Sequence, residues 1–295
     1  MGVYDSRMRR LLAVTAAALL AVVAACSGAS DDEGPTGRAG YVAIGDSFVS
    51  GPGIATADPD QPGCLRSLSN YPHLVAAATS RRLTDVSCGG EDTTMLRDGR
   101  TLTDGTVVEP QLASIGRDTT LVTVGIGAND GSATAGLYTY CLLPTSADDT
   151  QCRTFTTSYM PEVLEKTRAS VVSVLDEVRE RAPTADVYLV GYLRIAPDEG
   201  AASCAGMSLT GERTQLVTQH EQALNAMLAE AAEQADVPFV DLWTASEGHD
   251  ACAGDQAWVN GLDDRTATGD GAFLHPTAAG MRAAAAALEE RLGRG

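Results

Sequence analysis

Five apolar segments of the chain have the composition of β-strands. They lie at residues 41–45, 83–88, 119–126, 186–192 and 238–242. The segment at 119–126 is the strongest, because its continuous run of apolar and β-branched residues is typical of a strand buried on both faces of a parallel sheet. The segment at 83–88 is the weakest of the five.

Four helical patterns separate or follow these strands. They lie at residues 71–82, 161–182, 212–236 and 276–292, and the last begins with a proline that suits a first helical turn. Strands that alternate with helices predict an α/β fold, with a parallel sheet of about five strands and helices on both faces. In such a sheet the ligand site is expected beyond the carboxyl ends of the strands.

The first 25 residues have the features of an export signal. Three arginines precede an apolar stretch at residues 11–25 that is too short for a membrane span. This stretch ends in Val23-Ala24-Ala25-Cys26, which resembles a bacterial lipoprotein box and implies cleavage before Cys26 and its lipidation. An ordinary secretory peptide cleaved near Ala25 is the alternative. We therefore expect an extracytoplasmic protein, anchored by lipid to the outer face of the cell membrane or otherwise secreted.

The rest of the chain divides into a tether and one domain. Residues 26–40 are rich in Ser, Gly, Asp, Glu and Thr and predict a flexible tether that follows the lipidated cysteine. Residues 41–295 are long enough for one large α/β domain with its own core, and no second boundary or internal repeat is visible. We expect a single domain and a monomeric protein.

Six cysteines remain after Cys26, and an even number in an exported chain indicates three disulfides. They lie in loop-like stretches, so pairing in sequence order is the simplest arrangement. It joins Cys64 to Cys88, Cys141 to Cys152, and Cys204 to Cys252. Their spacing matches no zinc-binding pattern, so we expect structural bridges and no metal.

The chain is strongly acidic, with a formal net charge of −18. Removal of the predicted signal, which holds three arginines and one aspartate, makes the charge about −20. Nucleic-acid binding requires a stripe of basic residues that meets the phosphates, and the sequence has none. We therefore expect no nucleic-acid partner.

Polar residues that suit acyl transfer follow three of the predicted strands. The run Gly45-Asp46-Ser47 ends the first strand, Gly90 follows the second, and Asn129 follows the third. Ser47 is the candidate nucleophile, and a helix N-cap is its alternative role. The candidate oxyanion donors are the backbone N–H groups of Ser47 and Gly90 and the side-chain amide of Asn129. A turn-forming residue is the alternative for Asn129.

His275 is the favoured general base among the four histidines. It lies between an apolar pair and Pro276, which starts the last helix, so a rigid element can hold it at the edge of a cleft. The other three are better explained as surface or structural residues. His73 lies at a helix start, His220 in a charged amphipathic helix, and His249 in a loop near a cysteine.

Taken together, these motifs resemble the SGNH (GDSL) hydrolase superfamily, and most closely its secreted actinobacterial esterases and lipases. The residues that carry the resemblance are Gly45-Asp46-Ser47, Gly90, Gly127-Ala128-Asn129-Asp130 and His275-Pro276. The resemblance implies a three-layer α/β/α sandwich, and ester hydrolysis through a serine acyl-enzyme without a metal or other cofactor. It assigns the nucleophile to Ser47, the base to His275, and oxyanion donors to Gly90 and Asn129.

Two positions depart from the pattern of that superfamily. Glu91 stands where relatives often carry alanine, and its carboxylate either faces solvent or shapes substrate preference near the oxyanion. Position 272, three residues before His275, is alanine where relatives usually carry the aspartate that orients the histidine. The backbone carbonyl of Ala272 is the expected replacement, and the side chain of Asp270 is the alternative.

These features predict a serine esterase or lipase that hydrolyses the carboxylic esters of small molecules or lipids. A carbohydrate deacetylase and a phospholipase are alternatives on the same site. A non-catalytic lipoprotein that binds acyl or glycan ligands is the alternative outside the hydrolases, and the missing acid at position 272 is its support. The low aromatic content of 5% is unfavourable for a surface that stacks sugars.

Overall fold

A computed structural model describes residues 38–143, 149–197, 211–262 and 270–293, together with Cys204, Met207 and Leu209. The predicted signal peptide, the lipidation site at Cys26 and most of the predicted tether lie outside these residues. Within the described ranges, no helix combines the length and the apolar character that crossing a bilayer requires.

The first strand is longer than the sequence pattern indicated. β1 begins at Arg38, so residues 38–40 belong to the sheet and not to the predicted tether, and Gly40 pairs with Thr119. Strand pairing uses backbone groups, so a short polar segment can extend a strand without apolar side chains. The boundary of the folded unit therefore moves to residue 38.

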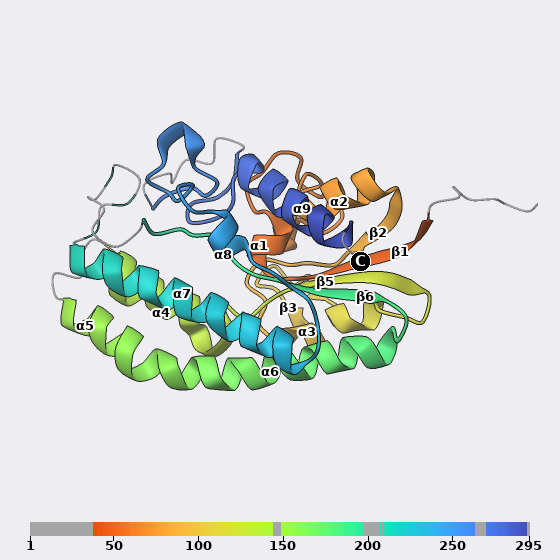
Figure 1. Cartoon of the computed structure of the whole chain (residues 1–295), viewed down its shortest axis with the longest axis horizontal. Coiled ribbons are helices and arrows are strands. Elements are labelled where there is room, and N and C mark those ends of the chain that lie inside the picture. The colour runs from red at the N-terminus through yellow and green to blue at the C-terminus, as the bar shows by residue number, and fades with distance from the viewer. Residues whose placement is uncertain are drawn as a thin grey trace, which may run out of the picture. The chain divides into compact units, whose positions relative to one another are not determined.

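Five parallel strands form the central sheet in the order β2-β1-β5-β6-β7 (Figure 1). They are β1 (Arg38–Gly45), β2 (Arg81–Asp85), β5 (Thr119–Gly125), β6 (Asp186–Val190) and β7 (Phe239–Val240). The short strands β3 (Arg100–Thr101) and β4 (Val107–Val108) form a separate antiparallel pair. The predicted parallel sheet of five strands is confirmed.

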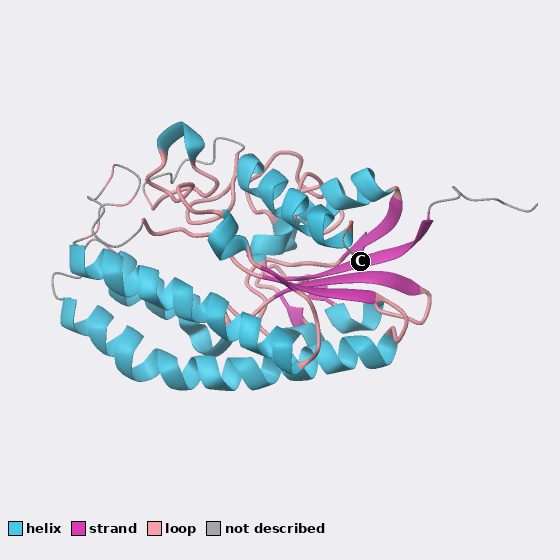
Figure 2. Ribbon diagram, in the orientation of Figure 1, coloured by secondary structure: helices cyan, strands magenta, loops and turns pink. Residues whose placement is uncertain are grey.

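Helices cover both faces of the sheet and complete a three-layer α/β/α sandwich (Figure 2). The long helices α2 (Tyr71–Thr79) and α9 (Ala278–Leu292) cover one face, and α6 (Met160–Arg181) and α7 (Gly211–Gln234) cover the other. The shorter helices are α1 (Ser47–Ser50), α3 (Met95–Asp98), α4 (Ala133–Leu137), α5 (Asp149–Thr154) and α8 (Leu242–Ala245). Single π-helical segments, Tyr138–Leu142 and Phe155–Tyr159, extend α4 and α5.

Strand β5 lies at the centre of the sheet, which explains its continuous apolar sequence. Val122 and Val124 pack into the core beneath α6 and α7, whereas Leu121 packs into the core beneath α2 and α9. All three side chains are fully buried. A strand with apolar side chains on both faces is stable only when helices cover both faces, as the sequence predicted.

Several predicted element ends differ from the structure for local reasons. The helix predicted at residues 71–82 ends at Thr79, because Ser80 adopts the left-handed conformation and Arg81 begins β2. The last helix starts at Ala278 and not at Pro276, because Thr277 is its N-cap and accepts the Gly280 N–H at 3.2 Å. The second strand ends at Asp85, although the Cys88 N–H still donates to a carbonyl of β1. The short strands and the helical segments at residues 133–142 and 149–159 were not predicted.

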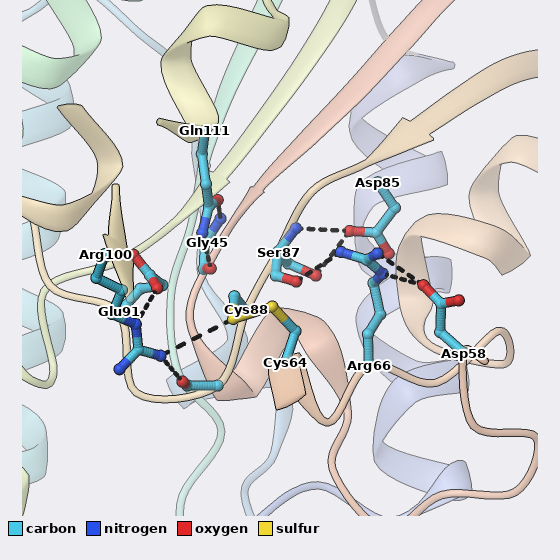
Figure 3. Close-up of a disulfide and its surroundings, with 11 residues drawn as sticks. Gly45, Asp58, Cys64, Arg66, Asp85, Ser87, Cys88, Glu91, Arg100 and Gln111 are labelled. Carbon is cyan, nitrogen blue, oxygen red and sulfur yellow. Dashed lines mark hydrogen bonds and ion pairs between the residues drawn. A yellow bond between two sulfur atoms is a disulfide. The ribbon is translucent and has the colours of Figure 1, made fainter. Parts of the chain in front are cut away.

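The three disulfides follow the predicted pairing in sequence order. They join Cys64 to Cys88, Cys141 to Cys152, and Cys204 to Cys252. Such bridges persist in an oxidising compartment, which indicates that the chain folds outside the cytoplasm. The first bridge ties the loop after α1 to the turn after β2, and that turn belongs to the candidate site (Figure 3).

Candidate active site

The strand order brings two chain segments together at the carboxyl edge of the sheet. β1 and β5 are neighbours, but the chain leaving β1 continues to α2 on one face, and the chain leaving β5 continues to α6 on the other. This reversal opens a crevice at the strand ends, where open α/β sheets bind their ligands. Ser47 follows β1 and Asn129 follows β5, so both predicted residues lie beside this crevice.

The turn between β1 and α1 fixes the position of Ser47. Gly45 has a φ of 153°, and a Cβ at this position would lie 2.3 Å from the Gly125 carbonyl oxygen, so no other residue fits. Asp46 is the N-cap of α1, and its carboxylate accepts the Phe48 N–H at 2.9 Å. Since Asp46 takes the N-cap role, the Ser47 hydroxyl is available for chemistry.

His275 meets Ser47 across the crevice, as the sequence predicted. The Nε2 atom of His275 lies 2.8 Å from the Oγ atom of Ser47. The histidine loop is fastened to the loop after Ser47, because the Ala272 N–H donates to the Pro52 carbonyl at 2.7 Å. This geometry lets an imidazole base take the proton of an attacking hydroxyl.

The other ring nitrogen of His275 meets a backbone carbonyl, but that carbonyl belongs to Phe273, whose oxygen lies 2.8 Å from Nδ1. The Ala272 carbonyl instead accepts the backbone N–H of His275 at 3.3 Å, which directs it away from the ring. The Asp270 carboxylate accepts the N–H of Ala278 at the start of α9, at 2.7 Å. Both residues that the sequence proposed for orienting the histidine are therefore wrong, although a main-chain oxygen does take this place.

The turn after β2 lies against the segments that carry Ser47 and Asn129. The Cys88 N–H donates to the Gly45 carbonyl at 3.0 Å, and the Asn129 side-chain amide donates to the Glu91 carbonyl at 2.9 Å. Three strand ends are thereby joined by hydrogen bonds. Asn129 therefore does more than form a turn, because its side chain also joins the loop after β5 to the turn after β2.

Three N–H groups at this junction are available to an oxyanion. In the part of the chain that the structure describes, no hydrogen bond occupies the backbone N–H of Ser47 or that of Gly90. A primary amide carries two N–H bonds, so Asn129 keeps one donor after bonding the Glu91 carbonyl. They are the three groups that the sequence proposes as oxyanion donors, and that role stays a prediction.

Glu91 does not face solvent, which corrects one of the two roles considered from the sequence. Its side chain is fully buried, and its Oε1 accepts the Nε–H of Arg100 at 2.7 Å (Figure 3). Burial raises the pKa of the carboxyl group, and Arg100 opposes that rise. No sequence pattern indicated this ion pair, because it joins the turn after β2 to Arg100 of β3.

A buried tyrosine connects the nucleophile turn to the Asn129 loop, and no sequence signal indicated it. The Tyr192 hydroxyl donates to Asp46 Oδ2 at 2.5 Å and accepts the Ala128 N–H at 3.1 Å. Burial raises the pKa of the Asp46 carboxyl to about 7, against the opposing hydrogen bond from Tyr192. Because one hydroxyl contacts the neighbours of Ser47 and of Asn129, it fixes the distance between these two segments.

An apolar cavity of about 350 Å³ opens beside Ser47, Asn129 and His275. It is lined by residues of α4 and α7, by residues that follow β6, and by the loop before α9. The apolar residues on its wall include Leu137, Tyr138, Met207, Val217, Leu224 and Phe273. Most of these residues belong to segments whose sequence pattern did not define a structure, so the sequence did not predict the cavity.

A comparison with known families decides the identity of this site. The sequence profile of the GDSL-like lipase/acylhydrolase family matches residues 43–283. The chain belongs to that family. It is therefore a carboxylic ester hydrolase, as the resemblance of its motifs predicted.

Individual relatives of this GDSL-family hydrolase cover almost its whole length. Lipase 2 of Streptomyces coelicolor is 34% identical over 264 residues, which cover 86% of this chain and 88% of the relative. A lipase of Streptomyces rimosus is 31% identical over 278 residues, which cover 93% and 95% of the two chains. The crystal structure of phospholipase A1 from Streptomyces albidoflavus NA297 has a TM-score of 0.69 at 29% identity, covering 85% of this chain and 98% of that one.

Burial disfavours the charged forms of two titratable residues on the cavity wall of the GDSL-family hydrolase. Burial raises the pKa of Glu221 to about 8, and burial lowers the pKa of His220 to about 4. Oε2 of Glu221 accepts the N–H groups of Ile195 and Ala196, both at 3.2 Å, and so holds the segment that follows β6. The cavity therefore suits an uncharged, apolar group.

The acid limb of the pH–rate profile is expected to have a midpoint below 6.5. Burial lowers the pKa of His275 from 6.5, and the Phe273 carbonyl opposes this shift only in part. Since the base acts in its neutral form, kcat/KM falls as the pH drops through this pKa. Asp46, with its pKa of about 7, also titrates near Ser47, and Glu221 on the cavity wall has a pKa of about 8. A midpoint at or above 7 that persists in Asp46→Asn would contradict the prediction.

Asp270→Asn is expected to retain kcat within about threefold, whereas loss of a triad aspartate typically costs about 10⁴-fold. The amide oxygen can still accept the Ala278 N–H, so the start of α9 is kept. Steady-state kinetics on p-nitrophenyl butyrate measures the effect. A loss above about a hundredfold in a folded variant would show that Asp270 orients His275 during the reaction.

Proposed function

We propose that the protein is a lipase-type esterase that uses Ser47 as its nucleophile, His275 as its base, and the apolar cavity as its acyl-binding pocket. The observation that carries the proposal is the 2.8 Å contact between Ser47 Oγ and His275 Nε2 at the mouth of a 350 Å³ apolar cavity. A retired site that only binds ligands has no need of a base in contact with a free hydroxyl.

The proposed reaction has two steps. In the first, Ser47 Oγ attacks the ester carbonyl carbon while His275 Nε2 takes the hydroxyl proton, and a tetrahedral oxyanion forms. The N–H groups of Ser47, Gly90 and Asn129 stabilise the oxyanion. His275 then passes the proton to the leaving alcohol as the carbon–oxygen bond breaks. In the second step, water attacks the acyl-enzyme with the same assistance and releases the acid.

The Phe273 carbonyl supports His275 in this mechanism. By accepting the Nδ1–H, it keeps the lone pair of the neutral ring on Nε2, where the Ser47 proton must go. It also stabilises the imidazolium, although less than a carboxylate does, because the carbonyl bears only a partial charge. The site is thus proposed to work as a serine–histidine dyad with a main-chain oxygen.

The size of the cavity favours acyl chains longer than acetyl. An acetyl group would leave most of the 350 Å³ empty, and each additional buried methylene contributes about 0.8 kcal/mol, or about fourfold in kcat/KM. Two relatives are named lipases and a similar structure is a phospholipase A1. Fatty-acid esters of glycerol are therefore the substrate class that we propose.

Hydrolysis of p-nitrophenyl esters from acetate to palmitate tests this proposal, with dioleoylphosphatidylcholine as a lipid substrate. We expect kcat/KM to rise about fourfold per methylene until the pocket is filled and then to level off. A profile that falls steeply after acetate would indicate a deacetylase. Turnover by the wild type that does not exceed that of Ser47→Ala would overturn the enzyme mechanism on this serine.

We also propose that Cys26 carries a lipid anchor, as the run Val23-Ala24-Ala25-Cys26 indicates. The three disulfides support an extracytoplasmic location for the domain. Fractionation of cells that express the full chain tests the anchor. The wild type should sediment with membranes, and Cys26→Ala should not. Equal membrane partitioning of both forms would rule the anchor out and leave an ordinary secretory peptide.

A further inference from the structure

Arg100 contacts the turn that carries Gly90, one of the proposed oxyanion donors. Its Nη2 donates to the carbonyl of Gly89, and its Nε donates to Glu91 Oε1 at 2.7 Å (Figure 3). Glu91 is fully buried, so the ion pair holds the guanidinium of Arg100 against the protein interior. Arg100 also lies 3.8 Å from the Cys88 sulfur, at the disulfide that anchors the start of the turn.

The contact with the Gly89 carbonyl determines where the Gly90 N–H points. Both groups belong to one planar, trans peptide, so the carbonyl and the N–H point in opposite directions. A donor that holds the Gly89 oxygen therefore holds the Gly90 hydrogen on the opposite side. A cationic donor on the oxygen also polarises the peptide and strengthens its N–H as a donor.

This peptide needs an external restraint. It joins two glycines, and Gly90 has a φ of 80°, so its rotation meets little steric resistance. The ends of the turn are held elsewhere. The Gly89 N–H donates to the Cys64 carbonyl at 2.9 Å, and the Glu91 carbonyl accepts from Asn129 at 2.9 Å. Within the described residues, Arg100 is the group that holds the carbonyl between these ends.

We propose that Arg100 is a positioning residue of the oxyanion hole. Its guanidinium locks the Gly89–Gly90 peptide with the Gly90 N–H towards the tetrahedral intermediate, and Glu91 locks the guanidinium. The inference rests on the proposed function, because it requires Gly90 to donate to an oxyanion. It also accounts for Glu91 at a position where a free carboxylate would oppose the developing negative charge.

Kinetics of Arg100→Gln test the inference. We expect kcat to fall about 10- to 100-fold while KM stays within about threefold, because the lost interaction forms only in the transition state. The affinity for an alkyl boronic acid, which forms a tetrahedral adduct with a nucleophilic serine, should fall by a similar factor. The kcat and the boronate affinity of Arg100→Lys should lie between those of the wild type and those of Arg100→Gln. One ammonium group keeps the charge but cannot reproduce the guanidinium's simultaneous contacts to Gly89 and Glu91.

Arg97→Gln is the matched control. Arg97 also donates through Nε to a glutamate, Glu177 at 2.9 Å, and its side chain is 30% exposed compared with 24% for Arg100. It joins α3 to α6 through Glu177 and Ser173, and none of its side-chain hydrogen bonds among the described residues reaches Ser47, Gly90 or Asn129. We expect Arg97→Gln to keep kcat within about twofold of the wild type, whatever its effect on the thermal midpoint.

Two results would overturn the inference. One is a folded Arg100→Gln that keeps kcat within about twofold of Arg97→Gln, and the other is a loss of kcat with no loss of boronate affinity. Should Arg100→Gln not fold, Glu91→Gln provides the test. Its amide oxygen still accepts from Arg100, so kcat should fall only a few-fold, and unchanged kcat and boronate affinity would refute the role. Turnover that survives Ser47→Ala would refute the proposed function itself, separately from these outcomes.

Discussion

Ser47→Ala is expected to lower kcat for an activated ester by about 10⁶-fold. The hydroxyl forms one hydrogen bond among the described residues, to His275 at 2.8 Å, so its removal should leave the fold intact. The residual rate should reflect the donors and the pocket alone. A spectrophotometric assay with p-nitrophenyl butyrate measures the loss, and far-ultraviolet circular dichroism verifies the fold.

His275→Ala is expected to cost about as much as Ser47→Ala, and the double variant hardly more than either one. Residues that act as a unit lose their joint effect once either is removed. Ser50→Ala is the matched control, because Ser50 is a buried serine of the same short helix whose hydroxyl has no hydrogen-bond partner within the described residues. Losses that multiply in the double variant, or a comparable loss in Ser50→Ala, would contradict the pairing.

The sequence located Ser47 and Asn129 because their positions follow from strand topology, and it located His275 because this residue precedes the proline at the start of the last helix. Strands β1 and β5 were recognisable from their apolar runs, and the carboxyl ends of parallel strands meet at one edge of the sheet. Polar residues directly after those runs must therefore lie near one another. The same argument fixed the general α/β architecture, since each long helix buries one apolar stripe against the sheet.

The carbonyl that orients His275 could not be predicted, because it depends on one backbone rotation. Leu274 has a φ of 57°, in the left-handed region that residues other than glycine seldom adopt. Leu274 separates Phe273 from His275 in the chain, and with this conformation the Phe273 carbonyl oxygen lies 2.8 Å from His275 Nδ1. Hydropathy and residue type contain no record of such a rotation, so the sequence pointed to the carbonyl at position 272, where relatives usually carry aspartate.

The groups that hold the site together escaped prediction for a different reason. Tyr192 reaches Asp46 across 146 residues, and Arg100 reaches Glu91 between two short elements without a clear sequence pattern. A tyrosine at the end of a buried strand resembles any other core residue until the packing is known. Strand topology therefore predicts where the site lies, whereas the side-chain hydrogen bonds that hold its segments in place become visible only in the structure.

In the proposed serine–histidine dyad, we expect the oxyanion donors to contribute more to catalysis than they do beside a full triad. The Phe273 carbonyl orients the His275 ring but stabilises the imidazolium less than a carboxylate does. Donors aimed at the developing oxyanion are typically the largest single contribution to acyl transfer. If the proposal holds, the turn that carries Gly90 must be held in place, and Asn129, which bonds to that turn, is the most informative residue to change next.

Asn129→Ala is expected to lower kcat by about 10²- to 10³-fold with little change in KM, which corresponds to about 3–4 kcal/mol of transition-state stabilisation. The variant loses the N–H that is proposed to donate to the oxyanion, and it loses the hydrogen bond to the Glu91 carbonyl. Asn129→Asp has nearly the same shape but lacks the donor, so it should lose at least as much activity. Equal losses in both variants would assign the effect to the N–H and not to side-chain volume.

Thr93→Val separates this effect from a general loosening of the Asn129 loop. The Thr93 hydroxyl donates to Asp130 Oδ2 at 2.5 Å in a buried contact, directly beside Asn129. Its removal should lower the urea midpoint of unfolding while kcat stays within about threefold, since the Asn129 amide is untouched. If Thr93→Val lost as much kcat as Asn129→Ala, loop order would account for the result. If Asn129→Ala kept its kcat and lost only KM, Asn129 would bind the substrate ground state and would not stabilise the oxyanion.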